Sequence, residues 1–132
     1  LQLQHYAPSS SLVSLYMKNN FESEEGFELA SDLVLLQTSE KETFYKAQNY
    51  ENIAHYYMSK QNYKNAAESF LQATEFYRIT DKTKPAETLY LCVECFNFAK
   101  MYSDAEETAK VLINLYPDTD YAKNVKKLLK NR

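Results

Sequence analysis

Glycine and proline are nearly missing from this chain of 132 residues, which contains one Gly, three Pro and no Trp. Tight β-hairpin turns depend on glycine, so the shortage argues against a β-sandwich and favours long helices with short connections. A glycine-rich phosphate loop is excluded for the same reason. The aliphatic run at residues 33–36 is much shorter than the roughly 20 apolar residues of a bilayer-spanning helix. We therefore expect no direct membrane insertion of this segment.

Residues suited to catalysis or metal binding are scarce, since the chain has two Cys and two His. Cys92 and Cys95 form a CxxC pattern near the middle of an expected helix, whereas a redox CxxC uses a helix N-terminus to lower the thiol pKa. A zinc site needs four ligands, and neither a second CxxC nor a paired His supplies them. We interpret Cys92 as a core residue and Cys95 as packed near a neighbouring helix. The sequence predicts no catalytic site, no metal and no cofactor.

The net charge of −3 gives no reason to expect nucleic-acid binding, but the charges are unevenly distributed. Residues 1–40 carry six acidic residues against one Lys, and the last ten residues carry five basic residues and no acid. One interpretation is a set of solvated helix faces. The other is end-to-end self-association between neighbouring modules or copies of the chain.

An internal repeat is the most informative feature of the sequence. When the sequence is displaced along itself so that Tyr50 falls on Leu89, eight pairs align whose sixteen members are all apolar or aromatic. Within each copy, spacings of three and four residues indicate helix faces. The pairs are Tyr50/Leu89, Ile53/Cys92, Ala54/Val93, Tyr57/Phe96, Tyr63/Tyr102, Ala66/Ala105, Phe70/Ala109 and Ala73/Leu112.

Each copy divides into two helices joined by a short connection, which is polar at residues 59–62 in the earlier copy and lies around residues 100–103 in the later one. Connections this short predict antiparallel helical hairpins. Small residues such as Ala54, Ala66 and Ala105 stand where two helix axes must approach closely, and large aromatic residues stand where the space between helices must be filled. The expected fold class is all-α.

The earlier copy has the pattern aromatic-x2-aliphatic-small-x2-aromatic, followed by Ala-x3-Phe-x2-Ala, and this pattern resembles the tetratricopeptide repeat. The later copy matches at Leu89, Phe96, Tyr102, Ala105 and Pro117 and departs at Cys92, Val93 and Ala109. The family unit has about 34 residues, so we place roughly five extra residues in a polar loop at 80–85, whose Pro85 suits the start of a helix. The resemblance implies an α-solenoid of antiparallel helical hairpins.

The closing stretch at 115–122 resembles the inter-repeat turns of bacterial envelope proteins, among them the outer-membrane assembly lipoprotein of the BamD type and the cell-division coordinator of the CpoB type. This resemblance implies a periplasmic or envelope-associated setting, in outer-membrane biogenesis, peptidoglycan coordination or a flagellar motor, with a cytoplasmic location left open. Asp118 or Asp120 is expected to cap a last helix over 121–130. Its apolar residues would shield the open end of the solenoid. They are Ala122, Val125, Leu128 and Leu129.

The first forty residues predict two further helices, over 9–18 and 24–36, as a degenerate repeat with Gly26 where later copies have Ala. Ser39 and Glu42 have the spacing of a capping box for a helix running to about residue 58. We expect one domain over 1–132, forming part of a larger protein. It comprises a degenerate helix pair at 8–38, repeats at 40–79 and 86–117, and a capping helix at 120–131. The candidate core of the degenerate pair is Leu12, Val13, Leu15, Tyr16, Phe27, Ala30, Leu33 and Val34.

In the tetratricopeptide family the first helix of each hairpin lines a concave groove, and ligand-facing residues fall between the core stripes. The resemblance therefore implies a non-catalytic scaffold, not an enzyme, that binds a peptide or helix of a protein partner. Alternatives are a regulatory or substrate-docking domain of a larger enzyme, a cytoplasmic adaptor, an oligomerisation module, or a face that packs on the rest of a longer solenoid. The implied partner-binding residues are Glu51, His55, Met58, Ser59, Tyr90, Glu94, Asn97 and Phe98.

Overall fold

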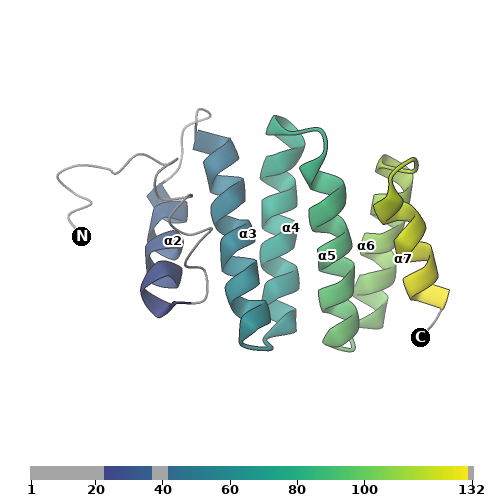
Figure 1. The fold of residues 1–132 in the computed structure, drawn as a ribbon, viewed down its shortest axis with the longest axis horizontal. Helices are drawn as coiled ribbons and strands as arrows, with labels where there is room; N and C mark the ends of the chain where they lie inside the picture. The colour runs from purple at the N-terminus through teal and green to yellow at the C-terminus, as the bar shows by residue number, and fades with distance from the viewer. Residues whose placement is uncertain (1–22, 37–41, 131–132) are drawn as a thin grey trace.

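Residues 23–36 and 42–130 are described by the computed structural model, and within these ranges the chain forms helices joined by short turns, without a β-strand. They stand side by side in chain order along the longest axis of the molecule (Figure 1). The all-α class expected from the glycine shortage is confirmed for these residues. The helices are α2 (Glu24–Leu36), α3 (Thr43–Ser59), α4 (Tyr63–Thr80), α5 (Lys84–Phe98), α6 (Tyr102–Leu115) and α7 (Asp120–Lys130).

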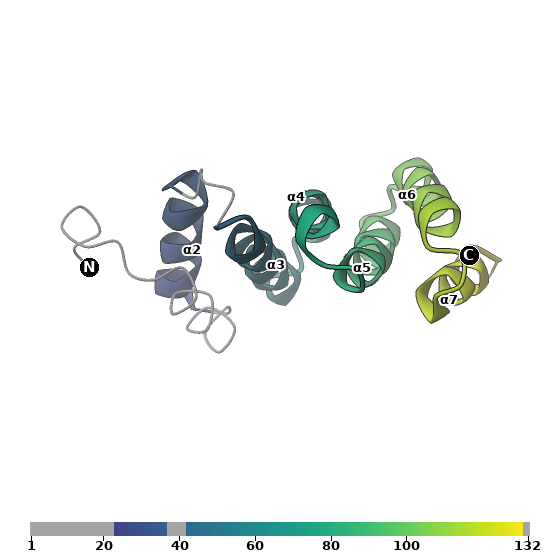
Figure 2. The ribbon, with the colours of Figure 1, turned by 90° about the horizontal axis from the view of Figure 1, so that it is seen from above.

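The helices from α3 onward form two layers. Each helix packs on the next one in the chain, and α7 also contacts α5. Seen from above, α4 and α6 lie on one side of the array, and α3, α5 and α7 lie on the other (Figure 2). The helix α2 packs on α3 and is inclined to the helices that follow it (Figure 2). The chain from α3 to α7 is therefore a zigzag of antiparallel helices.

The α3–α4 and α5–α6 turns share one backbone geometry at equivalent positions of the repeat. Gln61 and Lys100 both adopt a positive φ, of 60° and 62°. In each turn the next amide donates to the carbonyl five residues back at 2.8 Å, which is the Schellman ending of a helix. The repeat found in the apolar residues is therefore also present in the backbone. These bonds run from Asn62 to Tyr57 and from Met101 to Phe96.

Glycine at these two turn positions is expected to stabilise the fold. A residue with a Cβ is strained in the left-handed conformation, and helices that end this way most often carry glycine there. We expect Gln61→Gly and Lys100→Gly each to raise the free energy of unfolding by about 0.5–1 kcal/mol, as measured by urea denaturation. Gln61→Ala keeps the Cβ and serves as the control without a gain. A loss of stability in both glycine variants would contradict the turn geometry.

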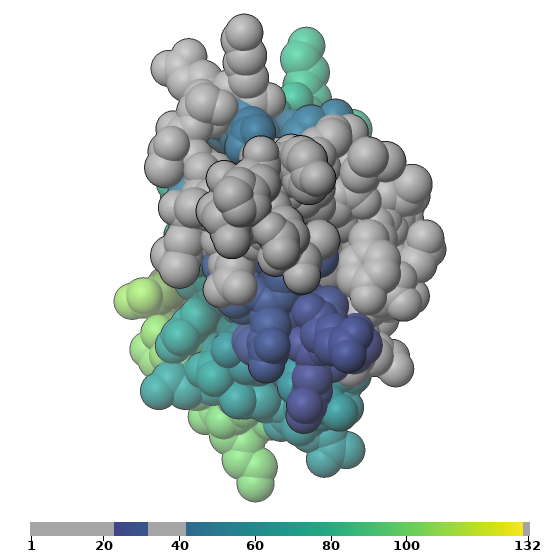
Figure 3. Space-filling view, turned by 90° about the vertical axis from the view of Figure 1, so that its left-hand side faces the viewer, coloured from purple at the N-terminus to yellow at the C-terminus, as the bar shows by residue number. Residues whose placement is uncertain are grey.

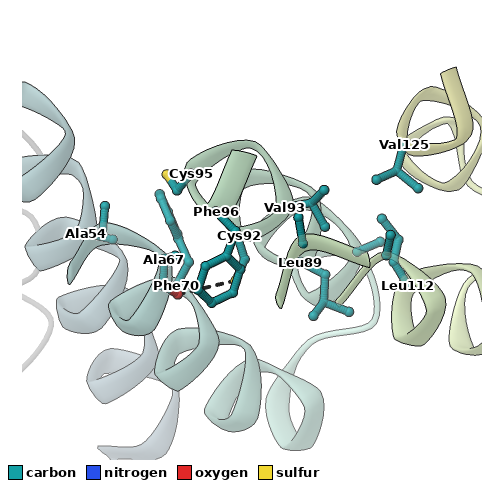
Figure 4. Close-up of a cluster of buried hydrophobic side chains, with 14 of the residues drawn as sticks. Ala54, Ala67, Phe70, Leu89, Cys92, Val93, Cys95, Phe96, Leu112 and Val125 are labelled. Atoms are coloured by element: carbon teal, nitrogen blue, oxygen red, sulfur yellow. Dashed lines mark hydrogen bonds between the residues drawn. The ribbon is translucent and has the colours of Figure 1, made fainter. Parts of the chain in front are cut away.

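A continuous apolar core runs from α3 to α7 and is drawn in Figure 4, from Ala54 to Val125. Phe70 of α4 and Leu112 of α6 are among its largest fully buried side chains. Val93 of α5 belongs to the same cluster, and α5 packs against both α4 and α6. Burial of one such side chain contributes roughly 1.5–3 kcal/mol. The contacts of α5 with its two neighbours therefore hold the later hairpin to the earlier one.

Most residues of the predicted repeat stripes are buried, and two tyrosines are half-buried for an identifiable reason. The ring of Tyr57 lies 5.4 Å from that of Phe27 on α2, and Tyr50 stacks on Phe76 of α4 at 5.8 Å. Both tyrosines therefore cover the edges of the core. The buried members of the stripes are Ile53, Ala54, Ala66, Phe70, Ala73, Leu89, Cys92, Val93, Phe96, Ala105, Ala109 and Leu112.

The start of α3 differs from the sequence expectation. The helix begins at Thr43, and Glu42 occupies the N-cap position without a side-chain cap hydrogen bond. The first apolar residues of α3, Phe44 and Ala47, pack with Tyr77 of α4. Glu42 thus stands at the N-cap and not at the third helical position that the predicted capping box requires. Ser39 itself lies outside the described residues.

The start of α7 is also corrected by the structure. The hydroxyl of Thr119 accepts the amide of Ala122 at 3.2 Å, so the cap is Thr119 and not Asp118 or Asp120. Asp120 is the first residue of the helix, where its negative charge suits the helix dipole. The apolar face is as predicted, with Ala122 and Val125 buried.

The extra residues of the repeat mostly lengthen α4 instead of forming the loop predicted at 80–85. The helix α4 has 18 residues and reaches Thr80, so only residues 81–83 lie between α4 and α5. The carboxylate of Asp81 accepts the amides of Thr83 and Lys84 at 2.8 and 3.0 Å, which satisfies amides at the start of α5. Pro85 lies in the first turn of α5, as expected.

The degenerate helix pair is described only in part. The helix α2 has the predicted bounds, and Ala30 is buried while Phe27 is half-buried. The hydroxyl of Ser23 accepts the amide of Gly26 at 3.0 Å and caps α2. The helix predicted over 9–18, with its four candidate core residues, lies outside the described residues.

Candidate functional site

A groove lies where α5 turns into α6. Its volume is about 230 Å³, smaller than the roughly 300–1,000 Å³ of typical small-molecule pockets. Three helices contribute to the lining, because α7 packs on both α5 and α6. The lining residues are Glu94, Asn97 and Phe98 of α5, Tyr102 of α6 and Leu128 of α7.

Two aromatic residues of the groove are exposed. Phe98 is the last residue of α5 and is 61% exposed, whereas Phe96, two residues earlier, is buried in the core. The ring of Tyr63 on α4 lies 5.1 Å from that of Phe98 and supports it from the side of the first hairpin. Tyr102, the first residue of α6, is 46% exposed. Aromatic side chains in such positions often carry much of the energy of a protein interface.

Glu94 supplies the one formal negative charge of the groove lining. Burial raises the pKa of its carboxyl, while a hydrogen bond from Tyr90 acts in the opposite direction. The ring of Tyr90 lies 5.8 Å from that of Tyr121 on α7, so Tyr90 is half-buried beside the groove. The groove thus combines an apolar floor with one partly buried carboxylate.

Glu51 was predicted to face a partner, but its carboxylate is occupied within the fold. Its side chain is 13% exposed. One oxygen accepts the hydroxyl of Tyr77 on α4 at 2.6 Å, and the other accepts the ammonium group of Lys84 on α5 at 3.1 Å. The imidazole of His55 lies 3.8 Å from the second oxygen. Glu51 therefore connects α3 to both α4 and α5.

The ionisation of this cluster reflects its contacts. Burial alone raises the pKa of Glu51, but hydrogen bonds from His55, Tyr77 and Lys84, with the charge of Lys84, outweigh it and bring the pKa to about 2. Burial lowers the pKa of Lys84, but Glu51 and Glu87 outweigh it, so the net direction is upward. Burial, followed by the negative charge of Glu51, raises the pKa of Tyr77. Glu51 and Lys84 therefore form an ion pair, and the neutral hydroxyl of Tyr77 donates a hydrogen bond to it.

The other predicted residues of the earlier copy do not line the groove. His55 meets the ring of Phe70 edge-on at 5.3 Å. Met58 packs against the core, and the exposed Ser59 donates its hydroxyl to the carbonyl of Tyr56 at 2.6 Å. The structure thus brings together Glu94, Asn97 and Phe98 from the predicted set, and it places Glu51, His55, Met58, Ser59 and Tyr90 elsewhere on the α3 and α5 layer. Binding by any of these residues stays a prediction.

Sequence reasoning missed two residues of the groove. Tyr102 was identified only as a repeat position that aligns with Tyr63, and Leu128 was assigned to the apolar face of the capping helix. The available signal was the helix start: Tyr102 opens α6 one turn before the first buried residue, Ala105. A side chain one turn ahead of the packed face stays near the end of its hairpin, where solvent reaches it.

A second groove, which the sequence did not indicate, lies between α4 and α6 over α5. Its volume is also about 230 Å³. Val111 and Leu115 are 44% and 46% exposed, and Glu75 and Arg78 pair with each other at 3.6 Å on its rim. This groove opens between the two helices of the other layer. The lining residues are Leu71, Thr74, Glu75, Arg78, Leu89, Glu107, Thr108, Val111 and Leu115.

The CxxC cysteines are structural, as interpreted from the sequence. Both Cys92 and Cys95 are free thiols and fully buried. The thiol of Cys92 donates to the carbonyl of Ala67 on α4 at 3.3 Å, drawn as a dashed line in Figure 4. Burial raises the pKa of both thiols, that of Cys95 to about 12. Neither side chain is poised for thiolate chemistry.

Comparisons with other proteins add no family to this geometry: no protein-family model, no curated protein and no solved structure matches the chain. Across residues 23–36 and 42–130, no group of three or more His, Cys, Asp or Glu side chains is arranged to hold a metal ion. In the same part of the chain, no helix combines the length and apolar character required to cross a bilayer.

Proposed function

We propose that this chain is a non-catalytic protein-binding scaffold of the tetratricopeptide type, which holds an apolar or aromatic side chain of a partner segment in the groove beside α5. The observation that carries the proposal is the groove with its exposed pair, Phe98 and Tyr102. Both residues lie on one small concave surface backed by a rigid core. Partner segments that dock in grooves are anchored in this way, by a few large side chains.

The tetratricopeptide assignment is supported by three properties of the fold. Two successive hairpins repeat one pattern of buried residues, their turns end in the same Schellman geometry, and their helices alternate between two layers. The non-catalytic assignment is supported by Glu51, whose pKa is strongly shifted because its carboxylate is bonded to Tyr77 and Lys84 within the fold. The envelope setting rests on the resemblance of the stretch at 115–122 and stays a prediction.

The proposal is tested by comparing two pairs of exposed side chains. A photo-reactive residue in place of Phe98 would first identify the partner in cells, and its binding to the purified chain would then be measured by calorimetry. We expect Phe98→Ala with Tyr102→Ala to weaken that binding at least about tenfold, because anchor residues lose about 1–2 kcal/mol or more on truncation. Circular dichroism would verify that the fold is kept.

The matched control is Ile79→Ala with Leu115→Ala, which truncates two other apolar residues, 77% and 46% exposed. The control should change the affinity less than about twofold. Leu115 lines the second groove. If the control weakens binding and the Phe98 and Tyr102 variant does not, the binding site lies on the α4–α6 face. A partner that binds all variants equally would rule out both grooves and contradict the proposal.

A further inference from the structure

Within the described residues, the first helix, α2, and the last helix, α7, carry opposite charges on their exposed sides. On α7, Lys123, Lys126, Lys127 and Lys130 are all exposed. Their spacings of three, one and three residues place them on one side of the helix, opposite the buried Ala122 and Val125. Four cations therefore form a stripe that faces away from the core, and we call it the basic face of α7.

The exposed side chains in the first half of α2 are acidic. Glu24, Glu25 and Glu28 are exposed, while Phe27 and Ala30 turn toward α3. The sequence of α2 contains no Lys or Arg. Figure 3 looks at this end of the array, where α2 reaches the surface. We call these three glutamates the acidic face of α2.

The helices between the two ends carry charges of both signs close together. On α4, Glu75 pairs with Arg78 at 3.6 Å. On α6, the exposed Lys110 stands one turn after Glu106 and Glu107. Because α2 and α7 stand at opposite ends of the row of described helices (Figure 1), the acidic and basic faces cannot meet within one chain. They can meet only between chains.

We propose that the basic face of α7 docks on the acidic face of α2 of a second copy of this chain. The two faces carry charges of opposite sign, so the basic face of one copy is attracted to the acidic face of another. Such a contact joins two different surfaces, so it propagates into a linear series of copies and does not close into a two-fold dimer. Exposed ion pairs are individually weak and salt-sensitive. We therefore expect association at roughly 0.1–1 mM protein and low salt.

Sedimentation equilibrium of the 132-residue chain tests the proposal. At about 20 mM NaCl the average mass should rise past that of a dimer as the protein concentration increases, and at about 500 mM NaCl the association constant should fall about tenfold or more. A chain that stays monomeric at low salt overturns the proposal. Association that is insensitive to salt, or that stops at a dimer, overturns it as well.

Charge reversal then identifies the two faces. One variant carries Glu24→Lys, Glu25→Lys and Glu28→Lys, and the other carries Lys123→Glu, Lys126→Glu and Lys127→Glu. Glu and Lys have similar helix propensities, so both variants should fold, as verified by circular dichroism. Each variant alone should lose self-association, because both of its ends then carry the same sign.

An equimolar mixture of the two variants should associate again, since every end of one is complementary to both ends of the other. This rescue cannot arise from general damage to the fold. The control variant carries Glu68→Lys, Glu106→Lys and Glu107→Lys. It changes the net charge by the same amount as the α2 variant, but on α4 and α6, and it should keep the association constant to within about twofold. Failure of the mixture to associate overturns the proposal, as does loss of association in the control.

Discussion

Replacing Phe70 by alanine is expected to lower the free energy of unfolding by about 3–5 kcal/mol, the largest single effect we predict. Phe70 is fully buried in α4, within the cluster that joins α3 to α5, α6 and α7. Its loss removes a large apolar surface and leaves a cavity that the surrounding helices close only in part. Because small domains are stable by about 5–15 kcal/mol, much of the total would be lost.

Urea denaturation followed by circular dichroism measures this change, with Ile79→Ala as the matched control. Ile79 lies on the same helix but is 77% exposed, so its truncation should change stability by less than about 0.5 kcal/mol. If the Phe70→Ala chain does not fold, Phe70→Leu gives the same comparison with an expected loss of about 1–2 kcal/mol. Equal stabilities of the Phe70 and Ile79 variants would contradict the packing described for α4.

The position of Phe70 could be predicted from the sequence because the buried face of a helix carries apolar residues at regular intervals of three and four. Residues such as Ala66, Phe70 and Ala73 recur at the spacing of one helix face, and a second copy of the pattern follows later in the chain. The apolar period therefore predicted the hairpins from α3 to α6 and most of their buried residues. It could not predict the caps of α3 and α7, since capping depends on single residues such as Thr119 that compete with equally suitable neighbours.

The grooves could not be predicted in the same way. A groove is formed by residues from separate helices, and Phe98, Tyr102 and Leu128 carry no common spacing. The prediction for Glu51 shows a further limit. A polar residue between core stripes can face a partner or the next helix, and the sequence does not say which. Glu51 faces the next helices because it pairs with Lys84, which lies 33 residues further along the chain.

Replacing Glu51 by glutamine is expected to lower the free energy of unfolding by about 2–3 kcal/mol near neutral pH. The fall of its pKa from 4.5 to about 2 corresponds to about 3 kcal/mol of preference for the charged form in the folded chain. The carboxylate is largely buried and accepts bonds from Tyr77 and Lys84. Glutamine keeps the shape of the side chain but loses the charge, and it leaves the half-buried Lys84 with Glu87 alone.

The effect should depend on pH in a defined direction. Because the pKa of Glu51 is lower in the folded chain than the ordinary 4.5, its contribution is complete above about pH 5 and is lost as the pH falls toward 2. The difference in stability between the natural chain and Glu51→Gln should shrink over the same range. Asp81, whose pKa is also lowered by amide hydrogen bonds from Lys84 and Thr83, is present in both chains and cancels in this difference.

Urea denaturation at several pH values between about 2.5 and 7 measures this difference, and Glu68→Gln on the exposed face of α4 is the control, with an expected change of less than about 0.5 kcal/mol. A difference that is constant with pH would contradict the ion pair. The pair also connects the two hairpins, since Glu51 and Tyr77 belong to the first and Lys84 opens the second. If the ion pair couples the unfolding of the two hairpins, Glu51→Gln should increase amide hydrogen exchange in α5 as well as in α3. If its role is local, amide exchange should increase in α3 alone.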